Sequence, residues 1–215
     1  MTTRKNGFAC EKYFWNRGFP LVAGVDEAGR GALAGPLVAG AVALSWSCVE
    51  KPRTRRLLLE HVRDSKRLSH AQRVEALELI RSCFLAVGTG VVEPGELDAI
   101  GLSAANRVAM ERAVVSLELL PDVLLIDAFT IESSVPQIGY IDGDDFVLSI
   151  SAASIVAKVT RDLIMEKLES SCPGYAFSRH RGYGTRQHLE ELAVTGPSEV
   201  HRRTFAPVRL ACEPS

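Results

Sequence analysis

Two adjacent acidic residues at the end of an apolar run are the first sign of chemistry in this chain. Residues 21–25 are largely apolar and lead directly into Asp26 and Glu27. Two neighbouring carboxylates repel each other, and burial raises the cost of charging each of them. Such a pair is stabilised by a positive charge close to both members, most often a divalent metal ion. We therefore interpret the pair as part of a metal site.

A glycine-rich turn follows the acidic pair and consists of Gly29, Arg30 and Gly31. Glycines let the backbone approach a ligand closely, and the planar guanidinium of arginine is suited to holding a phosphate. The acidic pair and the turn together predict a site for a metal ion and a phosphate.

Further acids follow other apolar runs. Asp127 ends the run 123–127, and the acidic cluster 142–145 follows the run 135–141. If these runs are adjacent strands, their ends gather the carboxylates at one edge of a sheet. Hard oxygen ligands of this kind suit Mg²⁺ or Mn²⁺ better than zinc. The alternative is that these acids lie in unrelated loops.

A helix predicted over about 149–170 carries polar residues at spacings that place them on one face. These residues are Ser151, Ser154, Lys158 and Arg161. Two hydroxyls and two cations in one line form a stripe suited to contacting phosphates. The alternative is a solvated helix face.

Two shorter segments are further candidates for substrate contacts. Ser65 and Lys66 place a hydroxyl beside a cation, and Tyr183 lies between Gly182 and Gly184 in a basic loop. An aromatic ring held in such a loop can lie against a sugar or a base. The alternative for Tyr183 is a ring that packs on its own domain.

The elements that must position these residues follow from the apolar pattern. Strands are predicted over 21–26, 37–44, 85–92, 123–127 and 135–141, and helices over 69–82, 96–120, 149–170 and 186–194. Ser69 is the expected N-cap of the first helix, and Gly196 is expected to end the last one. Three early strands followed by helix–strand–strand–helix predict an α/β fold with a mixed sheet covered by helices.

Composition and cysteine usage place the chain among globular proteins. It has 215 residues, of which 47% are hydrophobic and 24% charged, and its five cysteines show no CxxC spacing. A core of this size needs no disulfides, so we interpret the cysteines as thiols in a reducing compartment. No apolar run is long enough to cross a membrane, and residues 1–15 contain no signal-peptide core. We expect a cytoplasmic protein with no membrane partner.

The distribution of charge is more informative than its sum. The net charge of −1 excludes a uniformly basic nucleic-acid binder, but residues 172–210 contain six arginines against three glutamates, and residues 51–67 form a second basic stretch. Either stretch alone is equally consistent with ordinary solvated surface.

Two other classes of protein fit parts of this pattern. Gly29-x-Gly31-x-x-Ala34 matches the dinucleotide fingerprint of an NAD-type oxidoreductase, but that fingerprint must begin a helix, and here a strand-like run follows. Asp26 and Glu27 would also repel a pyrophosphate. A catalytically inactive nucleic-acid-binding module is the other alternative, and the complete set of acids argues against it, because pure binding gains nothing from buried carboxylates.

The ordered set of motifs resembles the bacterial ribonuclease HII family from about residue 20 to residue 210. The segments that carry the resemblance are GVDEAGRG at 24–31, LAGP at 33–36, DSK at 64–66, SAASIVAKVTRD at 151–162, GYGT at 182–185 and HRRTFAP at 201–207. Any one of these segments is a weak signal, whereas their common order is specific.

The resemblance implies an RNase H-like fold, with a catalytic domain over 1–171 and a small, basic, helical and loop-rich substrate-binding extension over 172–215. It implies a monomeric, metal-dependent endonuclease that cleaves the RNA strand of RNA/DNA hybrids. The enzyme is also expected to cleave 5′ of single ribonucleotides in duplex DNA, leaving 3′-hydroxyl and 5′-phosphate ends, as in ribonucleotide excision during DNA repair. Two Mg²⁺ or Mn²⁺ ions about 4 Å apart are expected at the scissile phosphate.

Carried over to this sequence, the family's four catalytic acids correspond to Asp26, Glu27, Asp127 and Asp144. The position after Gly143 favours Asp144 over its acidic neighbours. The residues expected to bind substrate are Gly29, Arg30, Gly31, Ser65, Lys66, Ser151, Ser154, Lys158, Arg181 and Tyr183. In the family the glycine–arginine–glycine turn helps to sense the 2′-hydroxyl, and the tyrosine senses the ribonucleotide junction.

Four positions depart from the family pattern. Ala32 stands where proline is usual, Ala128 where glycine is usual, and Asp142 and Arg181 where lysine is usual. The change at Asp142 makes the acidic cluster more negative, whereas Arg181 keeps the positive charge.

Overall fold

Residues 7–63 and 65–212 are described by the computed structural model, and five strands in this part form one mixed sheet. In spatial order they are β3 (Ala86–Val92), β2 (Leu37–Leu44), β1 (Val22–Ala28), β4 (Val123–Asp127) and β5 (Gln137–Tyr140). The β3–β2–β1 half is antiparallel, and β4 and β5 continue it in parallel with β1. All five predicted strands are confirmed, although β5 is shorter than the run that predicted it.

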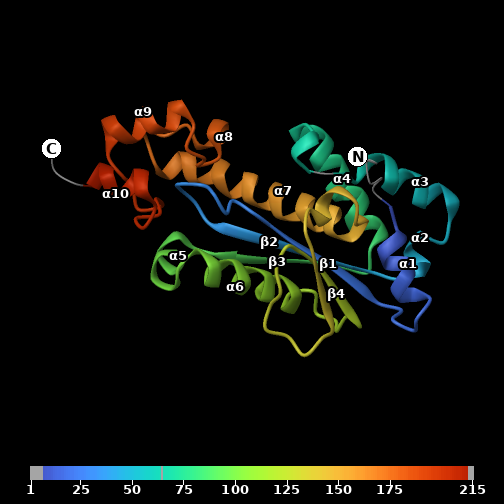
Figure 1. The fold of residues 1–215 in the computed structure, drawn as a ribbon. Coiled ribbons are helices and arrows are strands. Elements are labelled where there is room, and N and C mark those ends of the chain that lie inside the picture. Colours follow the sequence, from blue (N-terminus) through green and yellow to red (C-terminus); the bar gives the residue numbers. More distant parts are fainter. Residues whose placement is uncertain (1–6, 64, 213–215) are drawn as a thin grey trace.

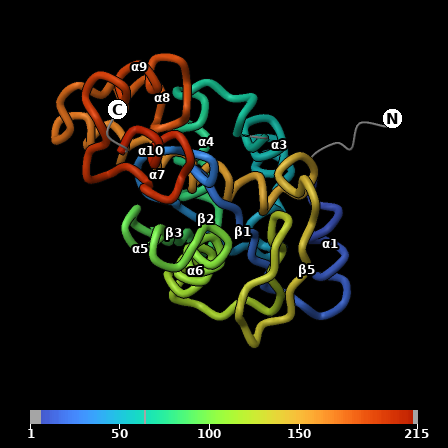
Figure 2. Tube along the Cα trace, turned by 60° about the vertical axis from the view of Figure 1, so that its left-hand side comes forward, coloured from blue at the N-terminus to red at the C-terminus, as the bar shows by residue number. Residues whose placement is uncertain are grey.

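The helices of the described residues cover both faces of this sheet. They are α1 (Ala9–Trp15), α2 (Trp46–Val49), α3 (Pro52–His61), α4 (His70–Cys83), α5 (Pro94–Ile100), α6 (Leu102–Val115), α7 (Leu148–Ser171), α8 (Phe177–His180), α9 (Arg186–Thr195) and α10 (Ala206–Cys212), with short 3₁₀ turns η1 (Ser65–Arg67) and η2 (Gly143–Asp145). Figures 1 and 2 show α7 on one side of the strands and α6 on the other. This is the predicted α/β architecture.

Burial on both faces explains why the strands read as unbroken apolar runs. Every residue of β2 is buried. The α7 helix also lies unusually close to the sheet: a Cβ atom added to Gly24 would lie 2.2 Å from the carbonyl carbon of Ser149, and one added to Gly40 would lie 2.3 Å from the carbonyl oxygen of Ala153. Glycine at these two positions lets the polar residues of α7 approach the strand ends.

The single helix predicted over 96–120 is wrong. The chain forms α5 and α6, which are separated by Gly101 with φ of 80°, and α6 ends at Val115. A positive φ ends a helix, and glycine adopts it without a steric penalty. The apolar spacing continues across the break because Leu97 of α5 and Ala105 of α6 pack into the same core cluster.

The other predicted helix signals are confirmed in detail. Ser69 caps α4, accepting a hydrogen bond from the Gln72 amide while the Gln72 side chain accepts one from the Ser69 amide. Gly196, with φ of 75°, follows the last residue of α9. None of the described helices combines the length and the hydropathy needed to span a bilayer, and none of the cysteines forms a disulfide.

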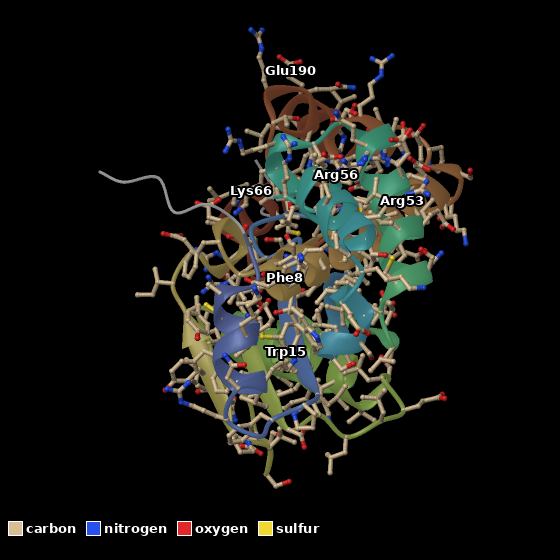
Figure 3. The ribbon with its side chains drawn as sticks, turned by 90° about the vertical axis from the view of Figure 1, so that its right-hand side faces the viewer. Phe8, Trp15, Arg53, Arg56, Lys66 and Glu190 are labelled. Atoms are coloured by element: carbon tan, nitrogen blue, oxygen red, sulfur yellow. The ribbon has the colours of Figure 1, made fainter. Side chains whose placement is uncertain are left out.

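The N-terminal helix α1, which was not predicted, is tied to the start of α7. Glu11 is fully buried, and its Oε1 accepts a hydrogen bond of 2.8 Å from the backbone N–H of Ser149. A carboxyl group there meets the positive end of the helix dipole, although burial raises the pKa of Glu11. Figure 3 looks onto this side, where Phe8 and Trp15 lie below the α3 residues Arg53 and Arg56.

The C-terminal helices α8, α9 and α10 pack together beside the second half of α7 (Figure 1). Their apolar cluster includes Leu33 and Ala34 from the loop after β1, Met165 of α7 and Phe177 of α8. The basic C-terminal segment therefore packs directly against the glycine-rich turn and the segment that follows it.

The contact between Glu11 and α7 predicts a graded effect on stability. Replacing Glu11 with Ala should lower the free energy of unfolding by about 1–3 kcal/mol, because the Ser149 amide would lose its acceptor inside the protein. Replacing Glu11 with Gln keeps an acceptor oxygen and most of the volume, so the loss should be clearly smaller. Urea unfolding of the two variants and the wild type measures both effects. Equal losses would contradict a capping role.

Candidate active site

The four candidate acids meet at one edge of the sheet. Asp26 and Glu27 lie near the end of β1, Asp127 ends β4, and Asp144 lies in η2. The parallel register pairs Val25 with Ile126, so Asp26 and Asp127 occupy adjacent positions on neighbouring strands. The strand ends thus deliver carboxylates to one place, as the sequence predicted.

A cleft of about 250 Å³ opens at this edge. The residues that line it are Asp26, Glu27, Ala28, Gly29, Arg30, Gly31, Ser65, Lys66, Asp127, Asp144, Ser154, Lys158 and Tyr183. The structure therefore brings together all four acids, the glycine-rich turn and five of the other expected substrate contacts. Ser151 and Arg181 do not line this cleft.

Burial and mutual repulsion dominate the electrostatics of the acids. The pKa of Asp26 is raised well above its ordinary value, first by burial and then by the charges of Glu27 and Asp127, while the Ser154 hydroxyl opposes the shift. Burial and Asp127 raise the pKa of Glu27 to about 6. Burial also raises the pKa of Asp127, against the hydrogen bond from the Gly143 amide. The positive charges nearby therefore do not offset the burial and mutual repulsion of these three acids.

The contacts of the individual carboxylates differ. Asp144 Oδ2 accepts a hydrogen bond of 3.0 Å from Lys66 Nζ, and Asp127 Oδ1 accepts one of 2.7 Å from the Gly143 amide. Glu27 Oε2 is buried without a hydrogen-bond partner. Asp142 is exposed and does not line the cleft.

The chemical type of the ligands at this site suits a hard divalent cation. All four acids offer oxygen ligands, and a buried carboxylate oxygen without a partner is an open position for a cation. In this structure, however, no three Asp, Glu, His or Cys side chains among residues 7–63 and 65–212 are arranged closely enough to hold one ion. Asp26 faces α7 and Glu27 faces α6, because consecutive strand residues point to opposite faces.

Asn106 of α6 is a residue that the sequence did not reveal. It is fully buried, and neither atom of its amide has a hydrogen-bond partner. The amide lies near Glu27 and lowers the pKa of that residue. A polar residue on the apolar face of α6 was the available signal.

A buried arginine of α7 lies against the glycine-rich turn and binds the backbone of the segment that follows it. Arg161 of α7 donates hydrogen bonds to the carbonyl oxygens of Pro36 at 2.9 Å, Ala34 at 3.0 Å and Arg181 at 2.8 Å. Gly29 has φ of 87°, and a Cβ atom there would lie 2.0 Å from Arg161 Nε. Arg161 was expected on a phosphate-contacting stripe, and that expectation is wrong because the loop covers this face of α7.

A second buried arginine, in the segment after α9, also donates hydrogen bonds to the backbone of the glycine-rich turn and of the residues after it. Arg202 donates to the carbonyl oxygen of Gly35 through Nε and to that of Arg30 through Nη1, both at 3.0 Å. The second residue of the motif at 201–207 thus holds the backbone of the glycine-rich turn and of the segment that follows it.

The other expected contacts on α7 and nearby divide into two groups. Ser154 Oγ lies 2.9 Å from Ser65 Oγ, and both residues line the cleft. Ser151 is fully buried and donates to the carbonyl oxygen of Asp144 at 2.6 Å, so it supports η2 instead of facing the cleft. Arg181 Nη2 pairs with Glu166 at 2.8 Å.

Tyr183 and Lys158 form the far wall of the cleft. The Tyr183 ring centre lies 5.7 Å from Lys158 Nζ and 5.3 Å from the Arg161 guanidinium. Lys158 also pairs with Asp162 at 2.7 Å. An aromatic ring beside a cation at the cleft is suited to a sugar next to a phosphate.

Two further observations bear on the sequence-based readings. No helix begins after Gly29, and β2 follows the turn instead, so the dinucleotide-binding alternative is wrong. Ala128 has φ of 55°. That left-handed conformation is unfavourable for any residue with a Cβ atom, which gives a physical reason for glycine at this position in the family that the sequence resembles.

Comparison with known proteins agrees with the sequence motifs. Residues 23–208 match the family model of ribonuclease HII. The chain is 45% identical over 204 residues to a ribonuclease HII of Dehalococcoides mccartyi, with 94% of each chain covered. It is also 45% identical to the ribonuclease HII of Bacillus subtilis, over 93% of this chain and 74% of that protein.

Solved structures show the same fold. The ribonuclease H2 of Pyrococcus horikoshii superposes with a TM-score of 0.73 at 28% identity, covering 89% of this chain and 96% of that one. The ribonuclease HII in the PCNA complex from Archaeoglobus fulgidus gives 0.69 at 25% identity, covering 90% and 98%. The RNase H-like fold is thereby confirmed.

The raised pKa values predict how charge removal affects the metal-free protein. We expect Asp26→Asn to abolish cleavage and to raise the midpoint of thermal unfolding near pH 7.5 by roughly 2–4 °C, because it removes one charge from a repelling cluster.

The expected gain depends on pH. The folded-state pKa of Asp26 and that of Glu27 lie above the ordinary values, so protonation stabilises the fold. That stability is lost as the pH rises from about 4.5 through about 6 for Glu27. The gain of the variant should therefore shrink as the pH falls towards 5. Thermal scans in a chelator at several pH values measure this, and an Asp26→Asn protein that is less stable than the wild type at neutral pH would contradict it.

The choice among the acids of η2 can be tested by paired substitutions. Asp144→Asn should reduce cleavage by orders of magnitude, because Asp144 faces the cleft beside Lys66. Asp145→Asn, on the exposed neighbour, should leave cleavage within a few-fold of the wild type. Steady-state cleavage rates of the two variants distinguish the two residues. A larger loss of rate in Asp145→Asn than in Asp144→Asn would identify Asp145 as the metal ligand.

Proposed function

Because this chain belongs to the ribonuclease HII family, we propose that its cleft hydrolyses the phosphodiester bond 5′ of a ribonucleotide, both in RNA/DNA hybrids and at single ribonucleotides in duplex DNA. The products carry 3′-hydroxyl and 5′-phosphate ends. Members of this family are hydrolytic nucleases of the ribonuclease H type. The observation that carries the proposal is a single cleft lined by the four acids, the glycine-rich turn and Tyr183.

The four acids are proposed to hold Mg²⁺ or Mn²⁺. When bound, such ions lower the pKa of an attacking water and stabilise the leaving 3′-oxygen. The support from this chain is the all-oxygen donor set, the repulsion among the acids and the open Glu27 Oε2. The chain itself supplies no nucleophile in this proposal.

The cationic and hydroxyl groups around the cleft are proposed to bind the substrate backbone. Arg30, Lys66 and Lys158 line the cleft and offer positive charge to phosphates on either side of the scissile bond. The turn backbone at 29–31 and the Tyr183 ring are proposed to read the sugar, because the 2′-hydroxyl is the group that distinguishes RNA from DNA.

We further propose that residues 172–215 form a substrate-binding extension of a catalytic domain over 1–171. The support is the packing of Phe177 and its neighbours against the loop after β1, which places Tyr183 at the cleft. The monomeric state and the cytoplasmic location stay predictions from the sequence.

Cleavage of defined duplexes tests the proposed function. The substrates are a DNA duplex with one embedded ribonucleotide, an RNA/DNA hybrid and an all-DNA duplex, each with Mg²⁺, with Mn²⁺ or with a chelator. We expect a single cut 5′ of the embedded ribonucleotide, cleavage of the hybrid and no cutting of the all-DNA duplex. Product mapping at nucleotide resolution and end labelling identify the bond and the termini.

Two results would overturn the proposal. Equal cleavage of the all-DNA duplex would remove ribonucleotide recognition, and cleavage that persists in the chelator would remove the divalent metal. Asp127→Asn serves as the matched negative control, because it changes one carboxyl oxygen of the cleft and keeps the side-chain volume.

A further inference from the structure

Three buried histidines lie under the loop that carries Tyr183. His180 ends α8, His188 lies in the first turn of α9, and His201 follows α9 in the chain. At most 6% of any of these side chains is exposed. The rings of His180 and His188 stack with their centres 4.2 Å apart. Nothing in the proposed hydrolysis uses these rings.

The histidines form a hydrogen-bonded chain whose direction is fixed by chemistry. His188 Nδ1 lies 3.0 Å from the carbonyl oxygen of Tyr183, which can only accept, so His188 carries its proton on Nδ1. Neutral His188 then accepts at Nε2, 3.0 Å from Nε2 of His201, which must donate. His201 in turn accepts at Nδ1 from the amide and hydroxyl of Ser198, at 3.1 Å and 2.8 Å.

A second arm holds the preceding residue. The Gly182 amide donates to His180 Nδ1 at 3.2 Å, and His180 Nε2 lies 2.9 Å from Glu191 Oε2, to which it donates. The carbonyl oxygen of Gly182 accepts from the Leu33 amide at 2.7 Å, next to the glycine-rich turn. The backbone on both sides of the Tyr183 Cα is therefore fixed by buried partners.

The neutral state of this chain is supported by its surroundings. Burial lowers the pKa of His201 to about 4, helped by the nearby His188 ring and the Arg203 charge. Burial also lowers the pKa of His188, against its hydrogen bond to the Tyr183 carbonyl. A chain of neutral imidazoles keeps one donor and one acceptor at each link, and a proton added at either link would set two donors against each other.

We propose that His188 and His201 are positioning residues for ribonucleotide recognition: through this chain of neutral imidazoles they fix the Tyr183 backbone, and with it the ring, at the wall of the cleft. The inference rests on the proposed role of Tyr183 in reading the ribonucleotide. Both histidines are buried away from the surface that a substrate could contact, and the proposed contribution to recognition is the one made through Tyr183.

Two substitutions at His188 test separately its hydrogen bond to Tyr183 and its hydrogen bond to His201. The side-chain nitrogen of Asn occupies nearly the position of histidine Nδ1, so His188→Asn keeps the donor to Tyr183. The terminal amide of Gln reaches nearly the position of Nε2, where its oxygen accepts from His201, so His188→Gln leaves the Tyr183 carbonyl with the Thr185 amide as its remaining donor. We expect His188→Gln to raise KM for the single-ribonucleotide duplex about tenfold, because the Tyr183 carbonyl loses the donor that ties it to α9, and His188→Asn to stay within a few-fold of the wild type.

Further measurements test the same hydrogen-bonded chain of histidines. His201→Leu removes the donor to His188 and should raise KM by less than His188→Gln does. Affinity for all-DNA duplex should be unchanged in every variant, since phosphate charge determines it. Hydrogen exchange of the segment 182–185 in the free protein should rise in His188→Gln and not in His188→Asn, which reports the loop without relying on catalysis.

A double-mutant cycle decides whether the effect passes through the tyrosine. If it does, His188→Gln adds nothing to KM in a Tyr183→Ala background. A loss that persists in that background, or equal behaviour of the Asn and Gln variants, would show a merely structural role and overturn the inference.

The outcomes also separate this inference from the proposed function. Wild-type protein that fails to cut at the ribonucleotide would defeat the proposed function and the inference with it. Normal cutting by Tyr183→Ala would defeat only the inference and leave the nuclease assignment standing.

Discussion

The guanidinium of Arg161 connects three of the segments that surround the cleft: α7, the loop after β1 and the loop that carries Tyr183. It is buried in α7 and donates to the carbonyl oxygens of Ala34 and Pro36 after β1 and of Arg181 before Tyr183. A buried charge is tolerated when its donors are bonded, and carbonyl oxygens satisfy this one without adding a negative charge. Because one cation serves both segments, the loop after β1 and the tyrosine loop are held side by side at the cleft.

Three of the cleft carboxylates are compensated much less completely than this guanidinium. Burial and mutual repulsion raise the pKa of Asp26, of Glu27 and of Asp127, and Glu27 Oε2 has no partner. The rest of the fold must hold these groups together against their repulsion. Close packing of α7 on Gly24 and of the apolar clusters on both faces of the sheet provides that restraint. Stability and function oppose each other at this edge.

The sheet and most of the site could be predicted from the sequence because both depend on local patterns. Strands buried on both faces read as apolar runs, and an acid at the end of such a run lies at the sheet edge. Spacing gives no information about which distant segment covers a helix. Arg161 shares a helical face with Lys158, yet a loop buries it while Lys158 reaches the cleft. The contacts of Arg202 and His188 likewise join segments far apart in the chain, so only the fold reveals them.

His201 and Arg202 contact the glycine-rich turn at 29–31 and the residues after it, although the two segments are far apart in the sequence. Arg202 donates to the carbonyl oxygens of Arg30 and Gly35, and His201 forms a β-bridge with Ala34. During synthesis, β1, β2 and β3 are all complete long before residue 202, so the sequence order allows them to pair before these contacts form. Translation thereby separates the formation of the sheet from the completion of the cleft. A nascent chain therefore carries Asp26 and Glu27 well before it carries Arg202, whose guanidinium holds the turn beside them.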